Sequence, residues 1–320
     1  MNKPDTVNSM KAVVECYLEE RRSLGFRSRT DEYELGRFAR YADERGHSGS
    51  LTQELVLGWA REHVIRTSDG TAAWRLARLR SFTAYYRQFE PTSYVPEPDI
   101  LGRRNRRPVP HIYSHQEIAA LLEATNLLMP RNGLRPLTYR TLFGLIAAAG
   151  LRLSEALKLT IDDIDLNAGT ITIRETKFKK SRCLPLHPTT VDALDLCRRS
   201  RDRYLPSGHD TTFFVTDTGS CLTTAAAGGV FTRLRSFLGW RGRGDYPMPR
   251  IHDLRHTFAV RRLQRWREEG VPVDQGVYWL STYLGHTKIS KTYWYLEGIP
   301  ELMALISDRF EHFVATGEMQ

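Results

Sequence analysis

The segment between residues 91 and 110 constrains the fold of this chain most strongly. It holds five prolines and four arginines, and its apolar residues follow neither a helical nor a strand period. Because proline fixes its φ angle and lacks a backbone N–H, such a run interrupts both helices and inner strands. The composition is typical of a linker between domains. Within 320 residues we therefore predict a domain at 1–92, a basic proline-rich linker at 93–110 and a second domain at 111–320.

The N-terminal domain is predicted to be a helical bundle. Apolar residues recur at helical spacing in four segments, namely 10–23, 30–43, 55–62 and 72–89. The last segment carries Arg75 and Arg78, which are candidates for contact with DNA phosphates. A solvated arginine-rich face explains the same pattern equally well.

The second domain is predicted to be mainly α with a small β-hairpin, which is the α+β class. Ser114 and Glu117 have the spacing of a capping box at the start of a helix. Residues 169–186 alternate apolar and polar side chains and predict a hairpin with its tip at 177–181. The remaining helical patterns cover 139–149, 191–199, 231–238, 252–269 and 300–313.

The charge balance favours a polyanionic partner without requiring one. Lysine and arginine total 46 against 37 acidic residues, which gives a formal net charge of +9. A solvated basic surface accounts for that excess as well. The four cysteines have no zinc-ligand or redox spacing, and we find neither a long apolar run nor a signal peptide. We therefore expect a cytoplasmic protein without membrane contact, metal site or cofactor.

An arginine and a glutamate near the start of the second domain could form an anion site. Arg152 falls at a predicted helix junction, where Ser154 can cap the helix and Glu155 lies in its first turn. A guanidinium steadied by a carboxylate can present two donors to a phosphate. The simpler interpretation is a structural ion pair between Arg152 and Glu155.

The predicted hairpin tip and a later helix each add a candidate for acid–base chemistry. Lys177 at the tip could protonate a leaving oxygen, although Lys179 and Lys180 stand beside it and turns are often rich in lysine. His252 and Arg255 are three residues apart, so a helix places them on one face, where they could clamp a phosphate. A histidine at a helix start is more often a cap or a packed residue.

A last segment contains a glycine turn and an aromatic cluster. Leu284, Gly285 and His286 end one predicted helix, and Ser290 can cap a short helix that carries Tyr295. Aromatic residues at 293–295 would ordinarily be assigned to the core.

Taken in order, these segments resemble the tyrosine recombinase (phage integrase) family over nearly the whole chain. The family pattern has Gly-Leu-Arg-x-Ser-Glu, then a hairpin lysine followed by a basic residue and an apolar-Pro-Leu strand. It continues with His-x-x-Arg and with Leu-Gly-His nine residues before a tyrosine. The matching positions are Gly150 to Glu155, Lys177 with Arg182 and Leu184 to Leu186, His252 with Arg255, and Leu284 to His286 with Tyr295. Family members often have glycine after the hairpin lysine, whereas Phe178 stands here.

The resemblance implies a mechanism and a role for each residue. Tyr295 would attack the scissile phosphate and form a 3′-phosphotyrosyl link, with His252 as the base. Arg152 and Arg255 would bind the non-bridging oxygens, and His286 would donate a hydrogen bond to the same phosphate. Lys177 would protonate the 5′-oxygen, and Glu155 would orient Arg152. The linker arginines, Arg103, Arg104, Arg106 and Arg107, are further candidates for DNA contact.

The resemblance also implies an assembly. Such enzymes act as homotetramers on double-stranded DNA with inverted half-sites, and a helical N-terminal domain and the catalytic domain enclose the duplex. The C-terminal helix, here 300–313, would pack on a neighbouring subunit, with packing on its own domain as the alternative, and accessory proteins are possible. The aromatic cluster at 293–295 favours a recombinase of a mobile element. A type IB topoisomerase and a DNA-binding accessory protein without turnover are the alternatives.

Overall fold

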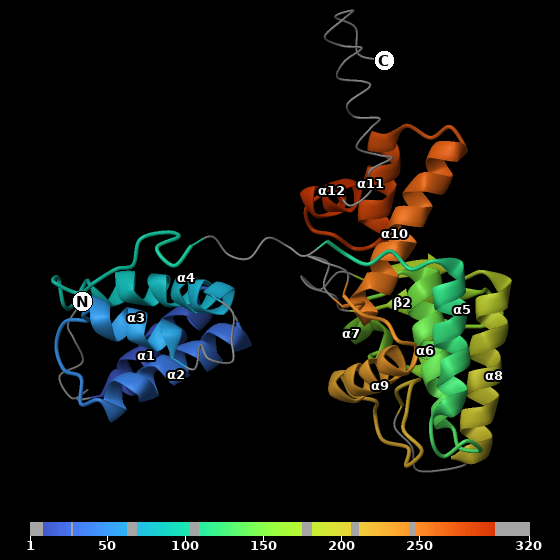
Figure 1. The fold of residues 1–320 in the computed structure, drawn as a ribbon, viewed down its shortest axis with the longest axis horizontal. Helices are drawn as coiled ribbons and strands as arrows, with labels where there is room; N and C mark the ends of the chain where they lie inside the picture. The colour runs from blue at the N-terminus through green and yellow to red at the C-terminus, as the bar shows by residue number, and fades with distance from the viewer. Residues whose placement is uncertain are drawn as a thin grey trace, which may run out of the picture. The chain divides into compact units, whose positions relative to one another are not determined.

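A computed structural model describes residues 9–26, 28–62, 69–102, 109–174, 181–205, 211–242 and 248–297. The chain divides into two compact units, Met1–Arg107 and Pro108–Gln320 (Figure 1). Each unit has its own apolar core. The fold is mainly helical with one small antiparallel sheet, as the sequence predicts.

The N-terminal unit contains the predicted helices. They are α1 (Met10–Ser23), α2 (Arg29–Glu44), α3 (Gln53–Arg61) and α4 (Asp69–Tyr86). A hydroxyl begins each of the first three, since Ser9, Ser28 and Thr52 accept hydrogen bonds from the backbone three residues on. Edge-to-face contacts of Phe38 with Trp59 and Phe82 lie at the centre of the bundle.

In the second unit, the largely buried helix α6 (Arg135–Ala149) packs against several of the other helices. The helices of this unit are α5 (His115–Ala124), α6, α7 (Leu153–Ala156), α8 (Pro188–Tyr204), α9 (Thr224–Phe237), α10 (Ile251–Glu268), α11 (Val273–Tyr283) and α12 (Ser290–Glu297). The capping box predicted from Ser114 and Glu117 begins α5. Helix α6 is apolar on nearly every side because it packs between α5, α8 and α10 (Figure 1).

The predicted hairpin is part of a three-stranded antiparallel sheet. Strand β1 (Ile164–Asp165), which the sequence pattern did not reveal, pairs with β2 (Thr170–Ile173), and β2 pairs with β3 (Arg182–Pro185). In this register Ile171 lies opposite Leu184, and Ile173 lies opposite Arg182. Opposed residues share a face, so Arg182 points to the same side as the buried Leu184. Residues 177–180 of the predicted hairpin tip lie outside the described residues.

A smaller apolar cluster joins α10, α11 and α12. It consists of Ala259, Val260, Leu263, Val277, Leu280, Leu284 and Tyr295. The predicted C-terminal helix at 300–313 lies outside the described residues. None of the helices in the described ranges is long and apolar enough to cross a membrane.

Gly150, which ends α6, can be replaced only at a cost in stability. Its φ is +63°, and a Cβ there would lie 2.3 Å from Cδ1 of Phe258 on α10. We expect Gly150→Ala to lower the free energy of unfolding by about 2–4 kcal/mol, from left-handed strain and overpacking. Urea denaturation followed by circular dichroism measures the change.

A second glycine in the same helix provides the matched control. A Cβ at Gly144 would meet Leu122 at 3.8 Å, an ordinary contact, in a helix interior. Gly144→Ala should therefore be neutral or stabilising by up to about 1 kcal/mol. Equal losses for the two variants would show that the conformation and packing at Gly150 are not the constraint inferred here.

Candidate active site

Arg152 is oriented by the carboxylate three residues after it. It is the N-cap of the four-residue helix α7, and its backbone N–H donates to Glu155 Oε2 at 3.0 Å. Its Nη1 donates to Glu155 Oε1 at 2.5 Å. The prediction of Ser154 as the cap was wrong, because α7 begins at Leu153 and Ser154 is already helical. The Arg152 side chain keeps 34% of its surface exposed, so it can still reach a ligand.

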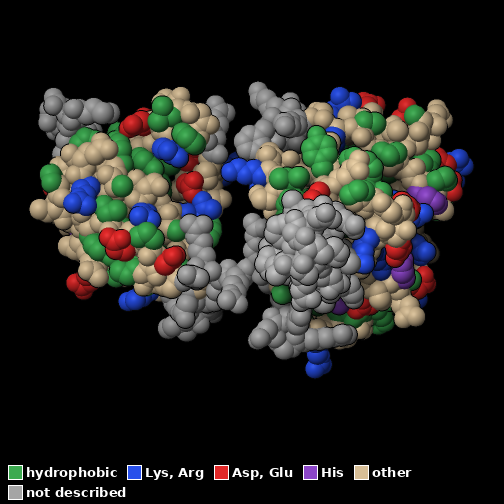
Figure 2. Space-filling view, turned by 90° about the horizontal axis from the view of Figure 1, so that it is seen from above, with side chains coloured by type: hydrophobic (Ala, Val, Ile, Leu, Met, Phe, Trp, Pro, Cys, Tyr) green, Lys and Arg blue, Asp and Glu red, His purple; other side chains and the backbone are tan. Residues whose placement is uncertain are grey.

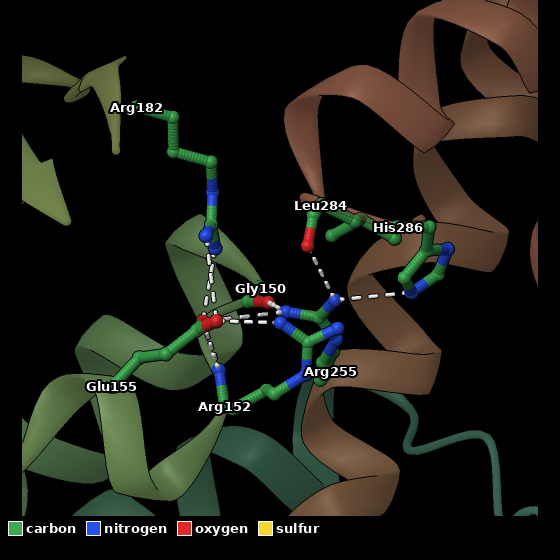
Figure 3. Close-up of polar contacts among 7 residues, drawn as sticks. All are labelled: Gly150, Arg152, Glu155, Arg182, Arg255, Leu284 and His286. Atoms are coloured by element: carbon green, nitrogen blue, oxygen red, sulfur yellow. Dashed lines mark hydrogen bonds and ion pairs between the residues drawn. The ribbon is translucent and has the colours of Figure 1, made fainter. Parts of the chain in front are cut away.

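Glu155 is a buried carboxylate shared by three guanidinium groups (Figure 3). In addition to Arg152, Arg182 donates from Nη2 to Oε2 at 2.9 Å and from Nη1 to Oε1 at 3.3 Å. Arg255 Nη1 lies 3.7 Å from Oε2. Burial raises the pKa of the Glu155 carboxyl, but the hydrogen bonds and charges of Arg182 and Arg152 outweigh burial and lower that pKa to about 2. Glu155 is therefore ionised throughout the physiological range.

Arg255 connects segments that are far apart in the sequence. It projects from the first turns of α10 and is only 1% exposed. Its Nη1 donates to the Gly150 carbonyl at 2.7 Å, and its Nη2 donates to the Leu284 carbonyl at 2.9 Å. Nη2 also lies 3.2 Å from His286 Nε2 (Figure 3). One guanidinium thus contacts the ends of α6 and α11 and the histidine after α11.

His286 is held in one tautomer by its two neighbours. Burial, then the charges of Arg255 and Arg152, lower the pKa of His286 to about 3, so the ring is neutral at neutral pH. Because Arg255 donates to Nε2, the proton of the ring is on Nδ1, which donates to Thr292 Oγ1 at 2.7 Å. Thr292 is buried on α12, so this bond links His286 to the helix that carries Tyr295.

Tyr295 lies among the charged and imidazole groups of the site. It is 4% exposed, and its ring stacks on that of His286 with centroids 5.9 Å apart. It also forms a side-chain hydrogen bond with Arg255. An interpretation of Tyr295 as a core residue alone is therefore incomplete, since its ring packs in the α10–α12 cluster while its polar contact is with Arg255.

Two histidines on α10 form a row of ring contacts that ends at the tyrosine. The ring of His252 contacts that of His256 at 4.6 Å, and His256 contacts Tyr295 at 5.1 Å. The surrounding protein atoms and then the Arg255 charge lower the pKa of His252. His256 is buried, and burial followed by the His252 charge lowers its pKa to about 3. The spacing of four residues between His252 and His256 on a helix was the signal that would have revealed His256 from the sequence.

The structure thus brings together six of the predicted residues. They are Arg152, Glu155, His252, Arg255, His286 and Tyr295. Lys177 lies outside the described residues, as do Arg103, Arg104, Arg106 and Arg107. Arg182 and Thr292 contact the site without having been assigned a role in it. In the described part of the chain, no group of three or more His, Cys, Asp or Glu residues is arranged to hold a metal ion.

Arg75 and Arg78 occupy different environments in the N-terminal unit. Arg75 is buried, donates to the Glu62 carbonyl at 2.8 Å and lies 3.8 Å from Glu34. Its partners are internal, which favours a structural role for Arg75, and its contact with DNA stays a prediction. Arg78 is partly exposed, pairs with Asp31 and lies over the Trp74 ring, and its contact with DNA stays a prediction.

A cavity beside Arg152 has a basic lining. It has a volume of about 370 Å³, and its walls include Arg152, Lys158, Arg174 and Lys291. The carboxylates in the same walls are Glu155 and Asp163, and Asp163 is paired with Arg174 at 2.5 Å. Elsewhere, Figure 2 shows basic side chains interspersed with acidic and apolar ones over the face that it presents.

Comparison with known proteins gives consistent matches. Residues 112–299 match the model of the phage integrase family. The chain is 38% identical over 310 residues to a putative integrase/recombinase, y4rB, of Sinorhizobium fredii, covering 95% of this chain and 98% of that relative. It is 28% identical to the tyrosine recombinase XerC of Chlamydia caviae, over 68% of this chain and 64% of that protein.

Solved structures show the same fold at low sequence identity. The XerH site-specific recombinase bound to palindromic difH substrate superposes with a TM-score of 0.64 at 21% identity, over 93% of this chain and 84% of that one. The Tn1549 transposon integrase in complex with circular intermediate DNA superposes with a TM-score of 0.64 at 19% identity, over 88% and 94%. From the family match and the 38% identity along almost the whole of y4rB, we conclude that this chain belongs to the phage integrase family of tyrosine recombinases, enzymes that break and rejoin DNA strands in site-specific recombination.

Proposed function

We propose that this recombinase moves a mobile element and cleaves each strand with Tyr295 as the nucleophile. The observation that carries the proposal is the convergence of Tyr295, Arg255 and His286 from two separate segments of the chain. Attack of the tyrosine oxygen on the scissile phosphorus forms a 3′-phosphotyrosyl bond and releases a 5′-hydroxyl. That hydroxyl can attack the phosphotyrosine of another strand, and so it reforms the phosphodiester and frees Tyr295.

The two arginines of the site suit the scissile phosphate. Arg255 is almost fully buried and Arg152 is partly exposed, and Glu155 orients both. Guanidinium groups fixed before the substrate arrives stabilise the negative charge of a pentavalent phosphorus most effectively. In this role Arg152 and Arg255 bind the non-bridging oxygens.

His286 joins the phosphate site once DNA is bound. In the free protein its Nε2 accepts from Arg255, so that atom has no proton to donate. The negative charge of a bound phosphate favours the protonated imidazole, since it opposes the effect of Arg255 and Arg152. We therefore propose that phosphate binding raises the pKa of His286 and allows Nε2 to donate to a non-bridging oxygen.

Attack by the Tyr295 oxygen requires a base that accepts the hydroxyl proton. His252 has a lowered pKa and is the proposed acceptor, because its ring is already in the neutral form. In the free protein His256 lies between the two, with ring contacts to both. We further propose Lys177 as the acid that protonates the 5′-oxygen, with Lys179 and Lys180 as the alternatives at the same hairpin tip.

The proposed substrate is double-stranded DNA with inverted half-sites. The basic cavity beside Arg152 is suited to the sugar–phosphate backbone that continues from the scissile position. The XerH recombinase is bound to a palindromic difH substrate, and the Tn1549 integrase is in complex with circular intermediate DNA. Two duplexes with two half-sites each take four subunits, so we propose a homotetramer that acts in the cytoplasm, with accessory proteins possible. Arg78 and the linker arginines are further proposed contacts with the DNA backbone.

Covalent trapping tests the nucleophile. Full-length protein is mixed with DNA fragments from its host element in EDTA and then denatured in SDS, and DNA that stays attached to protein is recovered and sequenced. We expect an adduct with the wild-type chain and none with Tyr295→Phe, because phenylalanine cannot form the phosphodiester link.

The neighbouring aromatic residue provides the matched control for this experiment. Tyr293 is 39% exposed, and its hydroxyl donates to Asp274 at 3.1 Å, away from the arginines. Tyr293→Phe should therefore retain the adduct. An adduct that survives Tyr295→Phe and disappears with Tyr293→Phe would assign the nucleophile to Tyr293, and no adduct on any fragment would count against strand cleavage by this chain.

The neutral histidines also predict a dependence of stability on pH. The pKa of buried His256 is lowered to about 3, whereas in the unfolded chain it is about 6.5. Below pH 6.5 the unfolded state therefore binds a proton that the folded state does not, and stability falls as the pH falls. We expect His256 to cost about 1 kcal/mol at pH 5.5 relative to pH 7.5. Urea denaturation at both pH values measures the change in the free energy of unfolding, and this change should be smaller in His256→Gln than in the wild type. Equal changes in the two chains would contradict the prediction.

A further inference from the structure

Arg182 is an inward-facing arginine on the strand that follows the hairpin tip. Its position opposite Ile173 in the β2–β3 register turns it to the apolar face of the sheet, and its side chain is only 12% exposed. A buried guanidinium is costly unless its charge is compensated. Within the part of the chain that the structure describes, each hydrogen bond of this guanidinium ends on Glu155.

The other side of the same guanidinium contacts the turn before His286. A Cβ at Gly285 would lie 2.9 Å from Arg182 Nη1, so the Arg182 side chain occupies the space that any other residue at 285 would need. The φ of +66° at Gly285 favours glycine for a second, independent reason. Arg182 therefore lies between Glu155 and the turn from Leu284 to His286, in direct contact with both.

The electrostatic consequence concerns Arg152 and Arg255. The Glu155 carboxylate contacts and orients both side chains. Its negative charge also reduces the positive potential that they can offer to a phosphate. Arg182 contacts both carboxylate oxygens and carries a compensating charge. With Arg182 in place, the carboxylate charge is compensated locally, so Glu155 withdraws little positive potential from Arg152 and Arg255.

We propose that Arg182 is a positioning residue of the recombination site, which neutralises Glu155 so that this carboxylate can orient Arg152 and Arg255 without weakening their attraction for DNA phosphate. The inference rests on the proposed function for the identity of the phosphate. Arg182 does not touch the phosphate, and it acts only through Glu155. A purely structural role would make Arg182 important whether or not residue 155 carries a charge.

A double-mutant cycle on the full-length chain separates these roles. The variants are Arg182→Met, Glu155→Gln and the two combined, and each is first shown to fold by circular dichroism. The rate of adduct formation is measured in EDTA on the DNA recovered by covalent trapping. We expect Arg182→Met to lower this rate at least about tenfold when Glu155 is present, and by less than about twofold in the Glu155→Gln background.

A conservative variant distinguishes charge from geometry and remains informative if Arg182→Met fails to fold. Arg182→Lys keeps the positive charge and loses the fork of two donors. We expect it to form the adduct within about fivefold of the wild-type rate. A loss with Arg182→Lys as deep as that with Arg182→Met, or equal losses for Arg182→Met in both backgrounds, would overturn the proposal.

Inorganic phosphate provides a readout that needs no DNA cleavage. The midpoint of thermal unfolding is measured with increasing phosphate at constant ionic strength, and Arg152→Ala identifies the part of the stabilisation that arises at this site. The phosphate concentration needed for half of that stabilisation should rise at least about threefold in Arg182→Met, and should be the same in Glu155→Gln and the double variant. If the wild type forms no adduct on any DNA, strand cleavage fails while this titration still decides the role of Arg182. If Arg182→Met needs the same phosphate concentration as the wild type for half of the stabilisation, the proposal is overturned.

Discussion

The buried carboxylate of Glu155 is the interaction on which the rest of the site depends. Removing a charge from water costs several kcal/mol, and such a group persists only when its partners satisfy it. Here the partners are the side chain and backbone of Arg152, the fork of Arg182 and the more distant Arg255. These three arginines come from a helix start, a strand and a long helix. The ionised carboxylate of Glu155 therefore fixes the relative positions of α7, β3 and α10.

The backbone contributes to the same site through two helix ends. The carbonyls of Gly150 and Leu284 both accept from Arg255 after α6 and α11 have ended, where carbonyls lack partners within their helices. The left-handed conformations of Gly150 and Gly285 shape these ends, and each leaves space that a neighbouring side chain fills, namely Phe258 and Arg182. The two glycines of the family motifs thus have a physical explanation in packing as well as in φ.

The parts of this structure that follow from local rules were accessible from the sequence. Helical periodicity and the Ser114–Glu117 capping box predicted the main helices, and alternation predicted β2 and β3. Linear spacing, read together with the family resemblance, was enough to select Arg152, His252, Arg255, His286 and Tyr295. Contacts between distant segments were not accessible. Arg75 was interpreted as a surface residue because periodicity does not reveal Glu34, and Ser154 was interpreted as a cap because Arg152 occupies that position instead.

The location of Tyr295 in an apolar cluster has a consequence for how this proposed nucleophile is positioned. Helix α12 has only eight residues, and a helix of that length has little stability of its own in water. Its placement therefore depends on contacts such as the packing of Tyr295 in the α10–α12 cluster and the bond between Thr292 and His286. His286 in turn depends on Arg255, which Glu155 and two backbone carbonyls hold in place. Tyr295 and the proposed phosphate-binding residues thus fix one another's positions, so a change that loosens α12 should disturb the proposed phosphate site as well.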